Sequence, residues 1–148
     1  MFTKILLPAD GSPWALAAAE FARGLLRLDP SARLTILHVR QLPKPVFRVY
    51  RWREVEIPLS EELKRDVCEA EERILAQTEK IFTDAGLAVD NEIVSGSPAE
   101  QICAYAAKGG YDLIVMGVHS GGKTDTFRNS PSHQVLQTAK SPVVLVKA

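Results

Sequence analysis

The sequence lacks the features that mark most specialised classes of protein. Its 18 basic and 18 acidic side chains balance over 148 residues, so its charge indicates neither a nucleic-acid partner nor an anionic membrane. No apolar run approaches the roughly 20 residues of a membrane-spanning helix, and the N-terminal residues do not have the pattern of a secretory signal. The two cysteines, Cys68 and Cys103, do not have the spacing of metal ligands, and we expect buried, reduced thiols. We therefore expect residues 1–148 to form one cytoplasmic domain that binds neither nucleic acid nor membrane.

What the sequence does contain is an alternation of short apolar runs with longer amphipathic stretches. Five runs are predicted to be strands: Lys4–Pro8, Arg33–Val39, Ala88–Val94, Asp112–Met116 and Pro142–Val146. Continuous apolar strands separated by helices predict an α/β fold, an open five-stranded parallel sheet with helices on both faces. In such Rossmann-like sheets, ligands bind beyond the carboxyl ends of the strands, where the direction of winding reverses.

Serine residues mark the predicted starts of three of the helices. Ser12 and Ser60 are expected to be N-caps, and Ser97 with Glu100 forms a capping-box pattern. The second helix is predicted to bury one face, made by Leu63, Val67, Ala70, Ile74 and Ile81. A short last helix is expected around His133–Ala139.

Residues 40–59 are expected to be irregular, because Pro43, Pro45 and Pro58 argue against a long regular element. Within Leu42–Pro58, basic and aromatic residues alternate: Lys44, Phe47, Arg48, Tyr50, Arg51, Trp52 and Arg53. This pattern is found on surfaces that bind nucleic acid or a partner. It is more often found in loops whose aromatic rings pack on their own domain while the charges reach into solvent.

Asp10 follows the first predicted strand directly. A short carboxylate at this position can accept hydrogen bonds from a sugar or a base. It can also be a turn residue that stabilises the start of the first helix. The spacing alone favours this second interpretation.

The loop Gly117–Thr124 (GVHSGGKT) matches the phosphate-loop pattern GxxxxGK[ST] and follows a predicted strand. The next residues are polar and interrupted by Pro131, so they do not open the long helix of a P-loop enzyme, and too few residues remain for the rest of such a domain. His38 is expected to be packed in or at the end of its strand, and His133 to be structural, whereas His119 could contact a phosphate or solvent. No spacing indicates a metal site, a nucleophile or other catalytic residues.

Several segments together resemble the universal stress protein family, within the adenine nucleotide α-hydrolase-like superfamily. They are KILLPADGSPWALAAAEFA at the start, the strand ending Leu37-His38-Val39, SGSPAEQI, and DLIVMG followed by SPVVLVKA. The resemblance covers essentially the whole chain. It implies a parallel sheet of order 3-2-1-4-5, a homodimer formed along the last strand (Val143–Val146), and ATP phosphates held by a loop of pattern Gly-x2-Gly-x9-Gly-Ser/Thr.

Matched residue by residue, the resemblance is only partial in that loop. Gly117 matches the first glycine, Ser120 or Gly121 the second, and Asn129 the third. Pro131, which follows shortly after, has no backbone N–H to donate to a phosphate. Lys123 and Arg128 add positive charge. The implied nucleotide contacts are Pro8, Ala9, Asp10, Val39, Met116, Gly117, His119, Ser120, Gly121, Asn129, Ser130 and Ser132.

The resemblance thus implies a homodimeric stress-response protein that binds ATP or another adenine nucleotide as a regulatory ligand, with magnesium entering only together with ATP. An unidentified protein partner would read the state of the loop. Two alternatives remain at this point. One is a dimeric stress protein that binds no nucleotide and acts by protein interaction, and the other is an enzyme of the wider superfamily, which would be a slow ATPase at most.

Overall fold

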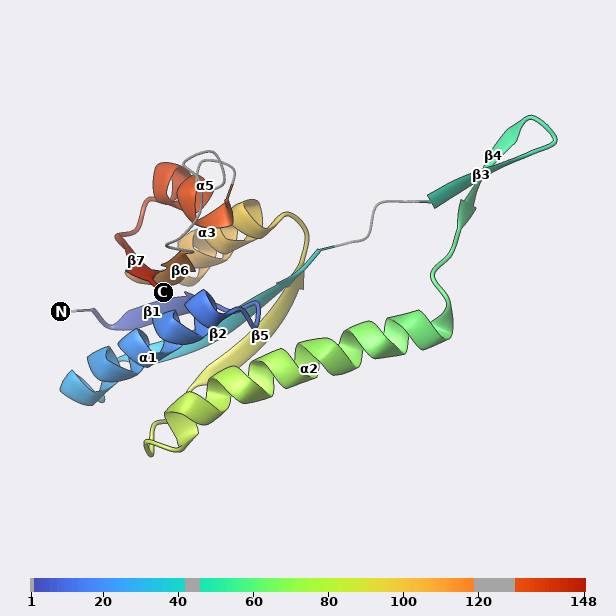
Figure 1. Cartoon of the computed structure of the whole chain (residues 1–148). Helices are drawn as coiled ribbons and strands as arrows, with labels where there is room; N and C mark the ends of the chain where they lie inside the picture. The colour runs from blue at the N-terminus through green and yellow to red at the C-terminus, as the bar shows by residue number, and fades with distance from the viewer. Residues whose placement is uncertain (1, 42–45, 119–129) are drawn as a thin grey trace.

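The computed structural model describes residues 2–41, 46–118 and 130–148. Its main body is a single parallel sheet with helices on both faces, and a two-stranded hairpin extends from it (Figure 1). Within the described ranges, no helix combines the length and the apolar character needed to cross a bilayer.

The sheet has the predicted class and order. From one edge to the other its parallel strands are β5 (Asp90–Ser95), β2 (Arg33–Arg40), β1 (Lys4–Pro8), β6 (Leu113–Val118) and β7 (Val143–Lys147). Since β5, β6 and β7 are the predicted third, fourth and fifth strands, the order 3-2-1-4-5 is confirmed. The chain crosses to the other side of β1 between β5 and β6, so the carboxyl ends of β1 and β6 flank the point at which winding reverses.

The helices described are α1 (Pro13–Leu28), α2 (Glu61–Thr83), α3 (Pro98–Gly109) and α5 (Pro131–Thr138). Ser12 and Ser60 are N-caps as predicted, each accepting a hydrogen bond from the amide three residues on. Ser97 occupies the N-cap position of α3 but its side chain makes no capping bond, so the predicted capping box is wrong. Pro98 at the first position already holds the helical φ, and the helix therefore starts without that bond.

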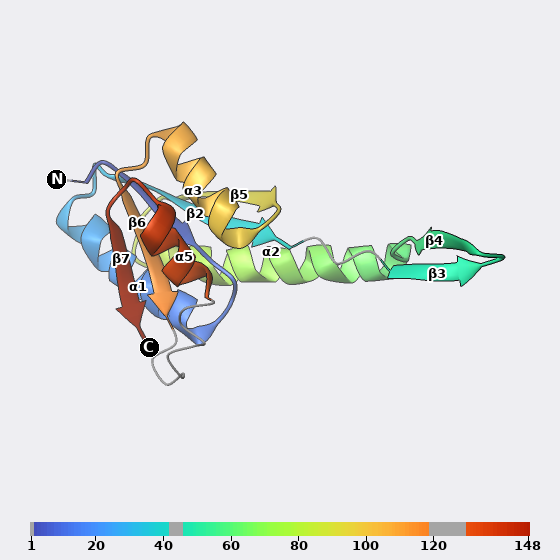
Figure 2. The same ribbon diagram turned by 90° about the horizontal axis from the view of Figure 1, so that it is seen from above.

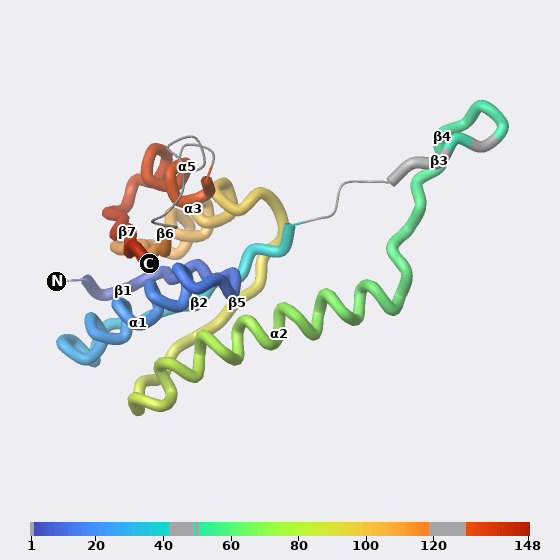
Figure 3. The backbone as a smooth tube through the Cα atoms, viewed as in Figure 1, coloured from blue at the N-terminus to red at the C-terminus, as the bar shows by residue number. Residues whose placement is uncertain are grey.

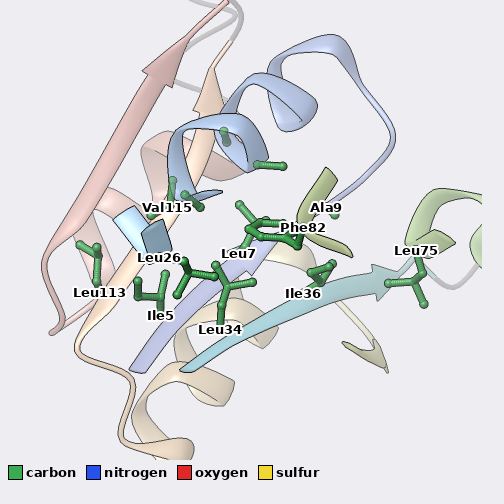
Figure 4. Close-up of a cluster of buried hydrophobic side chains, with 13 residues drawn as sticks. Ile5, Leu7, Ala9, Leu26, Leu34, Ile36, Leu75, Phe82, Leu113 and Val115 are labelled. Carbon is green, nitrogen blue, oxygen red and sulfur yellow. The ribbon is translucent and has the colours of Figure 1, made fainter. Parts of the chain in front are cut away.

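Each face of the sheet has its own apolar core. Helices α1 and α2 cover one face, where Ile5, Leu7, Leu34, Ile36 and Phe82 are among the buried side chains (Figure 4). Helices α3 and α5 cover the other face through a second set, Leu6, Leu37, Ile102, Ile114 and Val135. Neighbouring residues of β1 thus point to opposite cores, which is why its apolar run is continuous. Each fully buried large side chain contributes about 1.5–3 kcal/mol relative to exposure.

The start of the chain is tied to β6 by Asp112. Its carboxylate accepts hydrogen bonds from the amides of Thr3 (2.9 Å) and Lys4 (3.0 Å) and from the Thr3 hydroxyl (2.9 Å). Burial by itself raises the pKa of Asp112, but these bonds to the ionised form outweigh it, so the pKa lies below its ordinary value. Tyr111, which directly precedes Asp112, is also buried, and its hydroxyl donates a hydrogen bond to Thr35 Oγ1 at 2.7 Å.

The prediction of an irregular segment at residues 40–59 is wrong in its second half. Strands β3 (Val46–Tyr50) and β4 (Arg53–Ile57) form an antiparallel hairpin, with Tyr50 paired to Arg53. The two turn residues, Arg51 and Trp52, have φ of 48° and 65°, the positive values that a two-residue type I′ hairpin turn requires. The prolines do not prevent the hairpin because all three lie outside its strands.

The hairpin points away from the domain, and α2 returns the chain to the sheet (Figures 2 and 3). Trp52 at its tip is 98% exposed, so the expectation that this ring packs on its own domain is wrong. The predicted buried face of α2 also needs correction, because Leu63 and Val67 are exposed while Glu71, Leu75, Thr78 and Phe82 are buried. The reason is that the first turns of α2 extend beyond the edge of the sheet.

Both cysteines are free, but only one of them approaches the predicted burial. Cys103 on α3 is partly buried, and burial raises the pKa of its thiol. Cys68 lies on the projecting part of α2 and is exposed, so the prediction of a buried thiol is wrong there.

Candidate nucleotide site

A cavity of about 520 Å³ lies beyond the carboxyl ends of β1, β2 and β6. This is the edge of the sheet at which the strand order predicts a ligand site. Its size is within the range of small-molecule pockets. The residues that line it are Pro8, Ala9, Asp10, Trp14, Ala15, Leu37, Val39, Gln41, Pro98, Ile102, Met116, Gly117, Val118, Ser130, Pro131 and Ser132.

Most of the predicted site residues meet in this cavity although they are far apart in the sequence. Eight of them line it: Pro8, Ala9, Asp10, Val39, Met116, Gly117, Ser130 and Ser132. The other four, His119, Ser120, Gly121 and Asn129, lie outside the described residues, as do Lys123 and Arg128. The predicted phosphate-loop match is therefore described only at Gly117 and Val118, which are still part of strand β6.

The residues that the sequence analysis missed are mainly the apolar walls. They are Trp14, Ala15, Leu37, Gln41, Pro98, Ile102, Val118 and Pro131. Trp14 and Ala15 occupy the first turn of α1 and Ile102 lies on α3, so the cavity is enclosed by helices from both faces of the sheet. The position of Trp14 directly after the Asp10 turn was the available sequence signal.

Asp10 has the turn role that the sequence spacing favours, and its place at the cavity is compatible with the other role. Its Oδ1 accepts hydrogen bonds from the Ser12 amide (2.9 Å) and the Ser12 hydroxyl (2.5 Å), the geometry of a turn aspartate before a helix. Among the residues that the structure describes, no group donates to its Oδ2. Asp10 is exposed and lines the cavity, so one carboxylate oxygen holds the turn while the other remains available to a ligand.

The start of α5 forms another part of the cavity wall. Ser130 is the N-cap, with its hydroxyl accepting a hydrogen bond from the His133 amide at 3.3 Å, and it lies 3.0 Å from the Ser132 hydroxyl. Pro131 occupies the first helical position, so the helix start offers fewer amides than its length implies. The positive end of the helix dipole and two hydroxyls still face the cavity, and both favour a negatively charged group.

Gly117 is required by packing as well as by its place at the cavity. A Cβ at this position would lie 2.0 Å from the carbonyl oxygen of Trp14 and 2.8 Å from the Ala15 amide nitrogen. Its φ is not positive, so the close approach of α1 to β6 is what demands glycine. The glycine thus allows the first turn of α1 to form a wall of the cavity.

A polar cluster of His38, Arg40 and Glu71 joins β2 to α2 next to the cavity-lining residue Ala9. His38 Nδ1 lies 2.9 Å from the Ala9 carbonyl oxygen and therefore donates to it, while Nε2 lies 3.4 Å from Glu71 Oε2. Glu71, only 4% exposed, also receives both its hydrogen bonds from Arg40 Nε, at 2.8 and 3.0 Å. His38 is therefore packed at its strand end as predicted. The role of Glu71 was missed, although its spacing from Val67 and Ile74 places it on the same helical face.

A comparison with known protein families identifies the family of this chain. The model of the universal stress protein family matches residues 1–147. The chain belongs to the universal stress protein family. In sequence it is 31% identical over 150 residues to universal stress protein MJ0531 of Methanocaldococcus jannaschii, covering 99% of this chain and 83% of that protein. It is 30% identical over 159 residues to universal stress protein MJ0577 of the same organism, covering 99% and 96% of the two chains.

Solved structures of universal stress proteins have the same fold. The structure of MJ0577 aligns with a TM-score of 0.72 at 27% identity, covering 100% of this chain and 97% of the other. A universal stress protein in complex with cAMP aligns at 0.73 and 20% identity, covering 98% and 97%. One from Archaeoglobus fulgidus in complex with dAMP aligns at 0.67 and 19%, covering 99% and 98%. The last two likenesses are at the level of the fold.

Among the described residues, no group of three or more histidine, cysteine, aspartate or glutamate side chains has the arrangement of a metal site. The cavity lining that is described also contains no lysine or arginine. The described lining of this universal stress protein offers a ligand one carboxylate, the Gln41 carboxamide, two hydroxyls, a helix start and a large apolar wall.

Proposed function

We propose that this universal stress protein binds an adenine nucleotide, ATP or AMP, as a regulatory ligand in the cavity between Asp10 and the start of α5. The observation that carries the proposal is the distribution of chemistry in that cavity. The lining holds one carboxylate (Asp10), two hydroxyls at the start of a helix (Ser130 and Ser132) and many apolar side chains. A nucleoside phosphate carries the matching groups: a flat apolar base, ribose hydroxyls that can donate to a carboxylate, and an anion.

In the proposed arrangement, the ribose hydroxyls donate to Asp10 Oδ2, and the phosphates accept from Ser130, Ser132 and the amides at the start of α5. The adenine ring packs against the apolar wall at Val39 and Ile102. Ala9 also lines the cavity, and residues of strand β2 hold its backbone at both the amide and the carbonyl group. Its amide donates to Leu37 O at 2.9 Å, and its carbonyl accepts from His38.

Family membership supports this choice of ligand. The universal stress proteins solved with cAMP and with dAMP carry adenine nucleotides. We further propose a cytoplasmic homodimer joined along β7, which is the edge strand of the sheet and carries four half-buried apolar residues, Val143–Val146. Magnesium would enter only as the counterion of ATP.

Isothermal titration with ATP and AMP tests the proposal. Asp10→Asn keeps an oxygen for the Ser12 turn but loses the charge, and the loss of a charged hydrogen bond predicts roughly tenfold weaker binding. Asp29→Asn is the matched control, because Asp29 makes the same turn to Ser31 (2.5 and 3.2 Å) at the far end of α1. It should bind nucleotide like the wild type.

Three outcomes contradict the proposal in different ways. No heat at high-micromolar ATP or AMP would favour a stress protein that acts by protein interaction alone. Unchanged affinity in Asp10→Asn would mean that the ribose lies elsewhere. Sustained release of phosphate from ATP would assign an enzyme in place of a regulated binding protein.

A further inference from the structure

One turn of helix α2 lies against the segment that joins β1 to α1. Ile74 of α2 packs on the apolar core, and a Cβ on Gly11 would lie 3.0 Å from its Cγ1 atom. Glu71, which precedes Ile74 by three residues and so lies on the same face of the helix, approaches that segment through His38. The helix thus meets the segment at two places, one apolar and one polar.

His38 connects α2 to this segment through both nitrogens of its ring. Nδ1 lies 2.9 Å from the carbonyl oxygen of Ala9, and because a carbonyl can only accept, this nitrogen is the donor. Nε2 faces Glu71 Oε2 at 3.4 Å, and an ion pair forms there when the ring carries its second proton. The side chains of His38 and Glu71 are 12% and 5% exposed, so water competes little for these contacts.

The bond to Ala9 acts on the backbone that carries the Asp10 side chain. The carbonyl of Ala9 and the amide of Asp10 belong to one planar peptide group, so a bond to the oxygen fixes the orientation of that plane. The amide of Ala9 is held as well, because it donates to Leu37 O at 2.9 Å. Since Ser12 holds Oδ1 of Asp10, the position of Oδ2 is determined too.

We propose that His38 is a positioning residue of the nucleotide site, whose hydrogen bond to the Ala9 carbonyl fixes Asp10 for the ribose hydroxyls. This inference rests on the proposed function, because it requires that Asp10 receives a ribose. His38 is not among the described residues that line the cavity, so it acts through Ala9 and touches no ligand. Its loss should therefore weaken the contact of the ribose more than the contacts of the base or the phosphate.

Isothermal titration of the full chain with AMP and with dideoxy-AMP, which lacks both ribose hydroxyls, tests the proposal. The ratio of the two affinities isolates the ribose contact, because any loss common to both ligands cancels. For the wild type, one charged hydrogen bond predicts a ratio of roughly tenfold. His38→Gln keeps a donor close to the place of Nε2 but none beside Ala9, and the ratio should fall to near unity. His38→Asn puts its amide close to the place of Nδ1 and should rescue the ratio.

Thr35→Val is the matched control. Thr35 is buried on the same strand β2, nearer its amino end, and accepts the hydrogen bond of the Tyr111 hydroxyl at 2.7 Å. Valine has nearly the same shape but cannot accept that bond, so the variant should lose stability and keep the wild-type ratio. A purely structural role of His38 predicts a different pattern, in which His38→Gln keeps the ratio as Thr35→Val does.

An unchanged ratio in His38→Gln, or equal ratios in the glutamine and asparagine variants, overturns the proposal. A second measurement needs neither a variant nor a ligand, since proton–nitrogen NMR of the histidine rings reports which nitrogen carries a proton. A proton on Nδ1 of His38 supports the bond to Ala9, and a ring protonated at Nε2 alone overturns it. A wild type that binds neither nucleotide overturns the proposed function together with this inference, whereas a wild type that binds AMP and fails the ratio test overturns this inference alone.

Discussion

Gly117→Ala separates the packing role of this glycine from any role in holding phosphate. The added Cβ would lie 2.0 Å from the Trp14 carbonyl oxygen and 2.3 Å from its carbon. Backbone atoms cannot rotate away as a side chain can. The first turn of α1 must therefore move from β6 by roughly 1 Å or more to reach ordinary contact distances.

We expect the free energy of unfolding to fall by about 2–3 kcal/mol, at the upper end of the cost of overpacking. For a chain of this length, that corresponds to a melting temperature lower by about 4–12 °C. Urea unfolding followed by far-UV circular dichroism measures it without nucleotide. Nucleotide affinity should fall as well, since Trp14 and Ala15 move with the helix and line the cavity.

Gly24→Ala is the internal control for this prediction. Gly24 lies in the exposed middle of the same helix, and a Cβ there would meet no atom within 4 Å. That change should raise stability by about 0.5–1 kcal/mol through helix propensity. Equal stability of Gly117→Ala and wild type in the absence of nucleotide would refute the close packing of α1 on β6, and would leave the glycine as a ligand-binding feature alone.

Two further predictions concern buried and partly buried carboxylates. Glu71→Gln should lower the free energy of unfolding by about 1–3 kcal/mol, because it removes the buried anion that Arg40 and His38 contact, while the Arg40 side chain keeps access to water. Glu72→Gln on the exposed neighbouring position should change it by less than about 0.5 kcal/mol, and similar losses in the two variants would contradict the structure. Asp112→Asn should cost about 1–3 kcal/mol at pH 7. Because folding lowers the pKa of Asp112, its contribution is complete above the ordinary value of 3.8 and is lost as pH falls through the lower folded value. Urea unfolding between pH 7 and pH 2 should therefore show the variant and the wild type converging in acid, and a constant difference would rule out this carboxylate as the cause.

The parts of the fold that depend on short-range pattern could be predicted closely. Strand β1 was predicted with its observed bounds, and the N-caps Ser12 and Ser60 were correct, because an apolar run and a capping side chain act over a few residues. The position of α5 was predicted within two residues. The capping box at Ser97 failed because a proline at the first turn meets the same need by another route.

The candidate site could be predicted only in part. Asp10 was found because it follows a strand, and all parallel strands present their carboxyl ends at one edge of the sheet. Val39 and Gly117, which also line the cavity, were implied by the family resemblance. Trp14 and Ile102 were missed because they reach the cavity through the packing of α1 and α3 on opposite faces. No local sequence pattern indicates that those two helices meet at the cavity.

By itself, the sequence determined the class of fold and the edge at which a ligand site can form, since these follow from local periodicity and the rules of parallel sheets. The order of the strands in the sheet was implied by the family resemblance. Only the tertiary structure decided why Gly117 must be glycine, because the Trp14 carbonyl that excludes a side chain lies about a hundred residues away in the chain. It also decided that Glu71 is buried with His38 and Arg40, and that Leu63 and Val67, on the same helix, are exposed. Periodicity gives the faces of a helix. Where the sheet ends beneath that helix determines which part of a face is covered.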